Sequence, residues 1–495
     1  MTTLDHSNVR RLALGVLMPG FVGTELPDWL DALLRSGLGG VCLFAHNVDS
    51  LDQVAALTSA IYAANPMAIV SIDEEGGDVS RLHQRDGSPF PGNAVLGRID
   101  DVTVTRSVGR AVGAELASVG IHLTLAPDAD VNSDPNNPVI GVRSFGADPQ
   151  LVAAHTTAWI QGVQRAGVAA CAKHFPGHGD TSSDSHLTEP VVTADAQLLA
   201  RREFVPFEAA IAAGVKTIMT SHIRVPALDP DVAATFSPAI LGELLRGQMK
   251  FDGVIVTDAL DMVGASGERG IPAAAVAAVA AGSDLLCLGS NNAEAELHAV
   301  ADALTTAVTA GRLPVERLAS AHRRSLWLAR WMADQRLDDV RRVDSQPDPP
   351  LSVARVAASF TLSDHARHTL ATGSQQLHWV EIEPQQNVAI GTTPFGPFYE
   401  GGAVPRLIVP VGARHVPDDF RAEPGVLTVI VGRELHRDEG ARRAATDVAS
   451  KAKASGGNAV VVDMGFVNSD EVDIATFGAS RLVGQALIEL LDGSI

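Results

Sequence analysis

Short apolar runs recur along the first two thirds of the chain, and segments with helical periodicity separate them. Most of these runs are continuously apolar, as is typical of strands that are covered on both faces. The predicted strands begin at Leu12, Gly39, Ala68, Ile121, Val168, Lys216, Gly253 and Asp284. About eight strands alternating with helices predict a parallel α/β barrel of the TIM type, with a doubly wound sheet as the competing architecture.

Polar residues collect where these strands end, which favours the closed barrel over the open sheet. The carboxyl ends of barrel strands all point to one mouth, where barrel enzymes carry out their chemistry. A doubly wound sheet would spread the same residues along an edge. The polar residues at the strand ends are Asp73, Asp128, Asp130, Lys173, His174, Ser221, His222 and Asp258. We therefore expect the functional site at the mouth of the barrel.

A second α/β unit follows. A helix predicted from about Ala319 to Gln335 leads into a charged, proline-rich stretch that is typical of a linker. Four further strand patterns and two helical patterns follow, at 377–383, 406–411, 426–432 and 458–465, and at 439–453 and 481–491. The predicted organisation is a TIM-type (β/α)8 barrel over residues 1–335, a linker over 336–352 and a smaller α/β sandwich domain over 353–495. The second domain carries no site motif, so we expect it to pack, dimerise or close one side of the barrel mouth.

Composition and charge narrow the choice of partners. The 495 residues include 38 Lys and Arg against 58 Asp and Glu, a formal net charge of −20. Without a long basic cluster, neither nucleic acid nor an anionic membrane is an expected partner. Cys42, Cys171 and Cys287 each lie inside an apolar run, which indicates reduced core thiols and a cytoplasmic protein. The run after Arg11 stops at Pro19, so we interpret it as the first barrel strand rather than a signal peptide.

The segment KHFPGHGDTSSDSH, residues 173–186, packs acids, bases and small polar residues together directly after an apolar strand. One interpretation is a metal site built from His174, His178, Asp180, Asp184 and His186, as in a metal-dependent hydrolase. Another is acid/base machinery, in which Asp184 orients His186 and moves its pKa into the working range. The bare spacing leaves both interpretations open.

Asp258 ends a Val/Ile-rich strand in GVIVTDALDM. A carboxylate held rigidly at the mouth can attack an anomeric carbon, while a proton donor on a facing loop protonates the leaving oxygen. The alternative is that Asp258 caps the next helix.

Five segments together carry a family resemblance: KHFPGHGDTSSDSH, IDEEGGDVSRL, NPVIGVRSFG, IMTSHIRVPALD and IVTDALDM. In this order they resemble the bacterial β-N-acetylglucosaminidases of glycoside hydrolase family 3, over roughly residues 10–335. The segment TFGASRLVGQAL resembles the extra C-terminal domain of two-domain members. The resemblance implies a barrel and a retaining double displacement that uses no metal or other cofactor.

Carried over by motif, Asp258 is the expected nucleophile and His186, oriented by Asp184, the expected acid/base. The residues expected to hold the sugar's hydroxyl and N-acetyl groups are Asp73, Arg81, Arg143, Lys173 and His174. Alternatively, Arg81 and Arg143 form structural ion pairs with Asp128 or Asp130. His178 and His222 are expected to shape loops. The sequence departs from the family at Asp78, where an arginine is usual, so a positive charge near the mouth is missing.

The resulting prediction is a cytoplasmic, exo-acting, retaining β-N-acetylglucosaminidase that releases non-reducing-end GlcNAc, from muropeptides in peptidoglycan recycling. The nearest alternative is a phosphorylase that uses the same site with phosphate as acceptor. A metal-dependent hydrolase and a non-catalytic sugar-binding protein are alternatives of other classes. The expected partner is a small carbohydrate substrate, and the sequence leaves the oligomeric state open.

Overall fold

The computed structural model describes residues 6–181, 190–267, 269–339, 351–371, 376–385, 389–391, 394–399, 404, 406–413, 416, 420–422, 425–467 and 472–495. The chain forms two compact units. The barrel unit comprises residues 1–74, 102–133 and 147–348, and the C-terminal unit comprises 75–101, 134–146 and 349–495. Two segments that the sequence analysis placed in the first domain, 75–101 and 134–146, therefore belong to the C-terminal unit, while the predicted domain boundaries stay a prediction.

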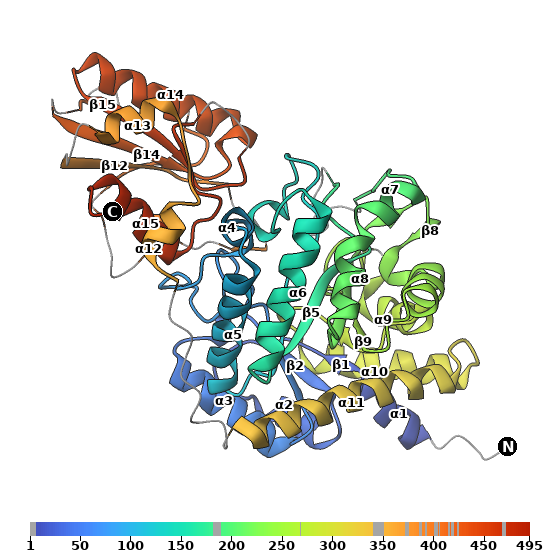
Figure 1. Ribbon diagram of the computed structural model, residues 1–495. Helices are drawn as coiled ribbons and strands as arrows, with labels where there is room; N and C mark the ends of the chain where they lie inside the picture. Colours follow the sequence, from blue (N-terminus) through green and yellow to red (C-terminus); the bar gives the residue numbers. More distant parts are fainter. Residues whose placement is uncertain are drawn as a thin grey trace. The chain divides into compact units, whose positions relative to one another are not determined.

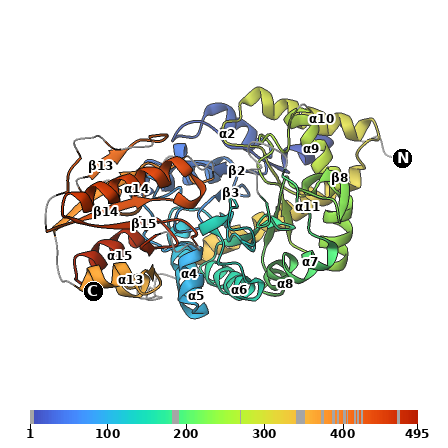
Figure 2. The ribbon, with the colours of Figure 1, turned by 90° about the horizontal axis from the view of Figure 1, so that it is seen from above.

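The barrel unit closes a ring of eight parallel strands, which confirms the TIM-type barrel (Figure 2). In chain order the strands are β1 (Leu17–Met18), β2 (Gly40–Leu43), β3 (Ile69–Ile72), β4 (Leu123–Thr124), β5 (Ala169–Phe175), β6 (Thr217–Thr220), β9 (Val254–Val256) and β10 (Leu286–Cys287). A parallel bridge between Val256 and Leu285 links β9 to the start of β10. The ring closes where β10 pairs with β1 and the Cys42 amide of β2 donates to the Pro19 carbonyl beyond β1.

Helices surround this ring (Figure 1). They are α1 (His6–Leu14), α2 (Asp28–Arg35), α3 (Leu51–Ala64), α5 (Val102–Ser118), α6 (Pro149–Arg165), α7 (Ala196–Arg201), α8 (Phe204–Ala212), α9 (Gly270–Ala281), α10 (Glu294–Thr309) and α11 (Val315–Asp339). Asp148 caps α6, since its carboxylate accepts hydrogen bonds from the amides of Gln150 and Leu151. Among the described residues, no helix is both long enough and apolar enough to cross a bilayer.

The prediction of a strand from Leu12 was wrong over its first half. Leu12–Leu14 end α1, and the strand itself is only Leu17–Met18. The buried residues of α1 are Val9, Ala13 and Leu14, a helical spacing that the continuous apolar run LALGVLM conceals.

One apolar cluster fills the barrel and contains the three cysteines, all buried and free. It joins Met18, Cys42, Ile69, Leu123, Ala169, Cys171, Met219, Val254 and Cys287 from the strands to Leu328 and Met332 of α11. Burial raises the pKa of Cys171 to about 12, so this thiol stays protonated. The expectation of core thiols rather than a disulfide framework is confirmed.

The C-terminal unit is an α/β sandwich, as predicted. Its sheet has the order β11-β16-β15-β14-β12-β13, with only β11 antiparallel to its neighbour. The strands are β11 (Thr361–Leu362), β12 (Gln376–Ile382), β13 (Arg406–Val409), β14 (Val426–Gly432), β15 (Asn458–Asp463) and β16 (Ile474–Ala475). The helices are α4 (Asn93–Ile99), α12 (Val353–Ala357), α13 (Asp364–Ala371), α14 (Glu439–Ala454) and α15 (Arg481–Leu491).

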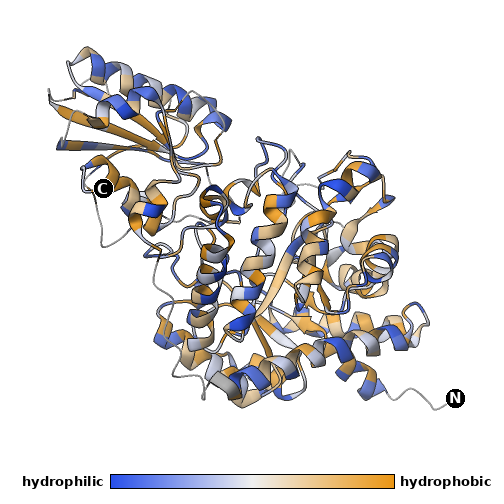
Figure 3. Cartoon of the chain, viewed as in Figure 1, coloured by the Kyte–Doolittle hydropathy of each residue, from blue (hydrophilic) through white to orange (hydrophobic). Residues whose placement is uncertain are grey.

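Side chains that alternate along these strands supply two cores, one on each face of the sheet. Val380 and Ile430 pack with Val448 of α14, whereas their neighbours Trp379 and Val429 pack on the other face with α12 and α15. Figure 3 shows the resulting pattern, with apolar strands between helices of mixed polarity. Val95 of α4 and Val142 belong to the second core, which explains why segments 75–101 and 134–146 fold with this unit.

Candidate active site

Two predicted sugar-binding residues form an ion pair inside the barrel unit. Asp73 directly follows β3, and Lys173 lies in β5. The Lys173 ammonium lies 2.8 Å from a carboxylate oxygen of Asp73, with the lysine side chain 3% and the aspartate side chain 20% exposed. The ends of β3 and β5, which β4 separates in the sheet, thus present a fixed pair of opposite charges. Such a pair suits the recognition of hydroxyl groups by donors and acceptors.

Asp130, beyond the end of β4, anchors the start of the loop that follows β5. Its carboxylate accepts hydrogen bonds from the His174 amide at 3.2 Å, from His174 Nδ1 at 2.8 Å and from the His178 amide at 2.7 Å. All three residues are buried. Because Nδ1 donates to the carboxylate, the bond sets the tautomer and the orientation of the His174 ring.

Asp130 and His174 also belong to a cluster whose side chains could hold a metal ion. Ligand atoms of Asp128, Asp130 and His174 lie within 4.8 Å of one another. This set differs from the one expected on the loop, since it takes in two residues from the end of β4. Both oxygens of Asp130 already accept N–H donors, and His174 Nδ1 is one of those donors. The geometry therefore accounts for Asp130 and His174 as members of an internal hydrogen-bond network.

His178 and His222 each form a hydrogen bond to a loop residue. His178 Nδ1 lies 2.8 Å from the Thr181 hydroxyl, within the loop. His222 Nε2 donates to the carbonyl of Ala259 at 3.0 Å, next to the predicted nucleophile. These contacts agree with the expectation that both histidines shape loops.

Asp258 is the second residue after β9 and is half-buried. One of its oxygens accepts the amide of Ala259 at 2.8 Å. The alternative that Asp258 caps the next helix is wrong, because α9 begins only at Gly270. The predicted acid/base residues Asp184 and His186 lie outside the described residues.

The two predicted sugar-binding arginines belong to the C-terminal unit. Arg143 makes a bidentate ion pair with Glu75, at 3.1 and 2.7 Å, and both side chains are at most 5% exposed. The ion-pair partner of Arg143 is thus Glu75, a residue that the sequence analysis did not single out. Arg81 donates to the carbonyl of Ala389 at 2.8 Å. Both guanidinium groups are held by contacts within this unit, and their role in sugar binding stays a prediction.

Asp78, which stands where the family has an arginine, is also held inside the C-terminal unit. Its carboxylate is 4% exposed, forms an ion pair with Arg433 and accepts the amide of Ala479 at 2.7 Å. A guanidinium from the loop after β14 therefore accompanies Asp78. Arg433 neutralises the Asp78 carboxylate, so this pair supplies no net positive charge.

Replacing Arg433 with methionine is expected to destabilise the C-terminal unit by about 3–5 kcal/mol, because it leaves the buried Asp78 carboxylate without its cation. Chemical denaturation of the variant measures this loss. The double variant Asp78→Asn/Arg433→Met is expected to regain much of it, and Arg443→Met, an exposed arginine of α14, serves as the control. An equal loss in the double variant would contradict the pairing.

Glu203 is a buried acid that the sequence analysis missed. It lies before α8, is 1% exposed, and accepts Arg202 Nε at 2.5 Å, while Arg202 also donates to Asp180 at 2.5 Å. A Cβ on Gly177 would lie 2.8 Å from the Glu203 side chain, so the loop after β5 rests directly on this acid. Burial raises the pKa of Glu203 to about 7, although Arg202 opposes the shift. Nothing in the sequence RREFVPF, residues 201–207, indicates that Glu203 is buried.

The raised pKa predicts a pH-dependent stability. The folded protein binds the Glu203 proton more tightly than the unfolded chain, whose carboxyl has the ordinary pKa of 4.5. The stabilisation of the folded state by the protonated Glu203 carboxyl is fully present below pH 4.5. It is lost as the pH rises to about 7, which lowers the free energy of unfolding by roughly 3 kcal/mol. We expect the stability difference between wild type and Glu203→Gln to change by this amount in denaturation at pH 4.5 and pH 8. The exposed Glu208→Gln is the control, and a constant difference would contradict the burial argument.

Comparison with known proteins places the chain among glycosidases. The sequence profile of the glycosyl hydrolase family 3 N-terminal domain matches residues 25–328. A beta-hexosaminidase of Alkalilimnicola ehrlichii is 34% identical over 355 residues, 68% of this chain and 98% of that relative. Beta-hexosaminidase A of Pseudoalteromonas piscicida is 40% identical over 266 residues, and the match spans 44% of its length. A family 3 beta-N-acetylglucosaminidase from Paenibacillus superposes with a TM-score of 0.82 at 29% identity, over 98% of this chain and 97% of that one.

Proposed function

The chain belongs to glycosyl hydrolase family 3, and from this premise we propose that it is an exo-acting, retaining β-N-acetylglucosaminidase. It is a glycoside hydrolase similar to known beta-hexosaminidases, in agreement with the family resemblance of its sequence. The observation that carries the proposal is the half-buried carboxylate of Asp258 at the end of β9, in a barrel whose strands β3 and β5 present the Asp73–Lys173 pair. The proposed substrate is a β-linked, non-reducing-end GlcNAc residue.

In the proposed mechanism, an Asp258 oxygen bonds to the anomeric carbon as the glycosidic C–O bond breaks. The leaving oxygen takes a proton from His186, which Asp184 orients. Water then attacks the glycosyl-enzyme, His186 takes its proton, and GlcNAc leaves with the original β configuration. Asp73 and Lys173 bind sugar hydroxyl groups, His174 is held in place for the same task by Asp130, and Arg81 and Arg143 are the proposed sugar contacts of the C-terminal unit.

One experiment separates this proposal from its nearest alternative. Turnover of an aryl β-GlcNAc glycoside is measured with and without phosphate, and the first-formed product is identified by NMR. We expect β-GlcNAc at a rate that phosphate leaves unchanged. A large phosphate-dependent rate with GlcNAc-1-phosphate as product would establish the phosphorylase, and loss of activity to a chelator would establish the metal-dependent hydrolase.

The acid/base pair has its own test. A bell-shaped pH profile is expected, in which Asp258 protonates on the acid limb and His186 loses its proton on the basic limb. Asp184→Asn should lower the rate and move the basic limb, because the asparagine no longer favours the charged imidazole. An unchanged basic limb and rate would contradict the pairing.

We further propose muropeptides of peptidoglycan recycling as natural substrates and a cytoplasmic location. The family resemblance supports both points, and the three buried, free cysteines also support a cytoplasmic location. Release of GlcNAc from purified muropeptides, together with fractionation of cells that produce the protein, tests these two points.

A further inference from the structure

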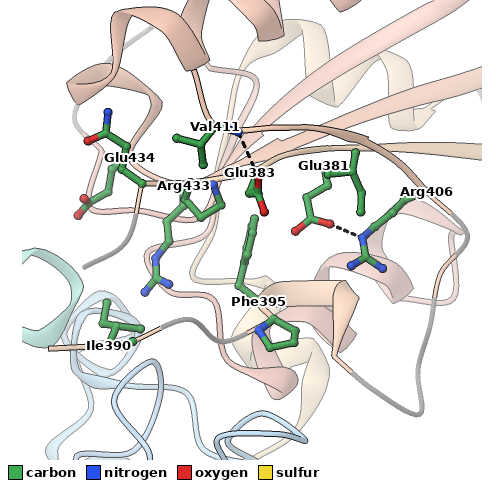
Figure 4. A pocket seen from close by; sticks show the side chains of 13 residues that line it. Glu381, Glu383, Ile390, Phe395, Arg406, Val411, Arg433 and Glu434 are labelled. Atoms are coloured by element: carbon green, nitrogen blue, oxygen red, sulfur yellow. Dashed lines mark hydrogen bonds and ion pairs between the residues drawn. The ribbon is translucent and has the colours of Figure 1, made fainter. Parts of the chain in front are cut away.

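The C-terminal unit contains a pocket of about 500 Å³ that the chemistry above does not use. Its lining comes from the ends of β12, β13 and β14 and from Ile390, Gly391, Pro394 and Phe395, all within this unit (Figure 4). Small-molecule sites in proteins commonly have volumes of 300–1,000 Å³. The pocket is therefore large enough for a ligand of two or three residues or one small metabolite.

The pocket lies where the sheet topology favours ligand binding. The parallel strands have the order β13-β12-β14-β15, so the chain leaves β12 toward β13 on one side and then enters β14 on the other. In parallel α/β sheets, ligands bind beyond the carboxyl ends of the two strands where the order reverses in this way. Glu383 directly follows β12 and Arg433 directly follows β14, and both line the pocket.

Charges of both signs surround the pocket. Glu383 is exposed and accepts the Val411 amide at 3.1 Å, and among the described residues it forms no ion pair. Figure 4 shows Arg433 on the facing side and the Glu381–Arg406 ion pair along one wall. One nitrogen of the Arg433 guanidinium pairs with Asp78, and the group has further N–H donors. A purely anionic ligand would be repelled by Glu383 and a purely cationic ligand by Arg433. A zwitterion therefore matches the lining best.

The rest of the lining is apolar and suits an aliphatic group. Ile390 and Phe395 are buried at 5% and 2% exposure, while Ile408 and Val411 are each 50% exposed.

We propose that this pocket binds a short zwitterionic peptide, with its ammonium on Glu383, its carboxylate on Arg433 and an aliphatic side chain against Ile408 and Val411. This inference concerns a second site and does not depend on the glycosidase proposal.

The test is calorimetric titration of the full-length protein with the dipeptide Ala-Leu. We expect saturable binding at one site, at least tenfold weaker for N-acetyl-Ala-Leu and for Ala-Leu amide, each of which lacks one charge. Glu383→Gln should weaken binding of Ala-Leu at least tenfold, whereas Glu439→Gln, an exposed acid of α14, should leave it unchanged. Matching melting temperatures of the two variants exclude a folding defect.

Three outcomes would overturn the proposal. The first is no saturable binding of Ala-Leu at millimolar concentration, and the second is equal affinity for the free and the blocked dipeptides. The third is an unchanged affinity in Glu383→Gln. Because none of these readings uses glycoside turnover, a failed peptide site leaves the glycosidase proposal untouched, and the converse also holds.

Discussion

Replacing Asp258 with alanine is expected to lower kcat for an aryl β-GlcNAc glycoside by about 10⁴-fold, because the variant lacks the group proposed to bond to the anomeric carbon. The fold should tolerate the change, since the side chain is half-buried and accepts the amide of the adjacent Ala259. Steady-state kinetics and a melting curve measure both effects. Asp252→Ala is the matched control, since this aspartate lies just before β9 with its side chain 97% exposed.

Azide distinguishes a nucleophile from a residue that merely supports the site. In Asp258→Ala, a small anion can enter the vacated space and attack the anomeric carbon directly, so azide should restore much of the rate and give an α-glycosyl azide. Trapping with an activated fluoro-sugar followed by peptide mass spectrometry should label Asp258 in the wild type. A label on another residue would contradict the assignment.

The second large effect is expected at the Asp73–Lys173 pair. Lys173→Met removes the ammonium that lies 2.8 Å from the Asp73 carboxylate and leaves that charge in a largely buried place. We expect a loss of about 3–5 kcal/mol in the stability of the barrel unit and about a 100-fold or greater fall in kcat/KM. Denaturation and kinetics measure the two losses separately.

The double variant Asp73→Asn/Lys173→Met separates structure from sugar binding. Removing both charges should recover part of the lost stability, since no lone charge is left buried. If both side chains contact the sugar, kcat/KM stays low in the double variant. Recovery of kcat/KM together with stability would instead show that the pair serves only the fold.

Much of the fold could be predicted because its signals are local. Continuous apolar runs marked most of the barrel strands. The last helix was predicted at 481–491 and is observed as Arg481–Leu491. The strand expected from Leu12 failed for the same local reason, because an apolar run of seven residues does not distinguish the end of a helix from a strand.

The sequence by itself determined the barrel, its strand-end residues and the second α/β domain, since periodicity and capping depend on residues at most a few positions apart. Only the tertiary structure decided the partners of the charged groups. Arg143 finds Glu75 from 68 residues away and Arg433 finds Asp78 from 355 residues away. Such pairs depend on strand order and on which core a loop joins, and both are set by packing between distant segments. For the same reason, neither the contact between Gly177 and Glu203 nor the pocket beside β12 and β14 could be predicted from the sequence, because both depend on which strands lie side by side.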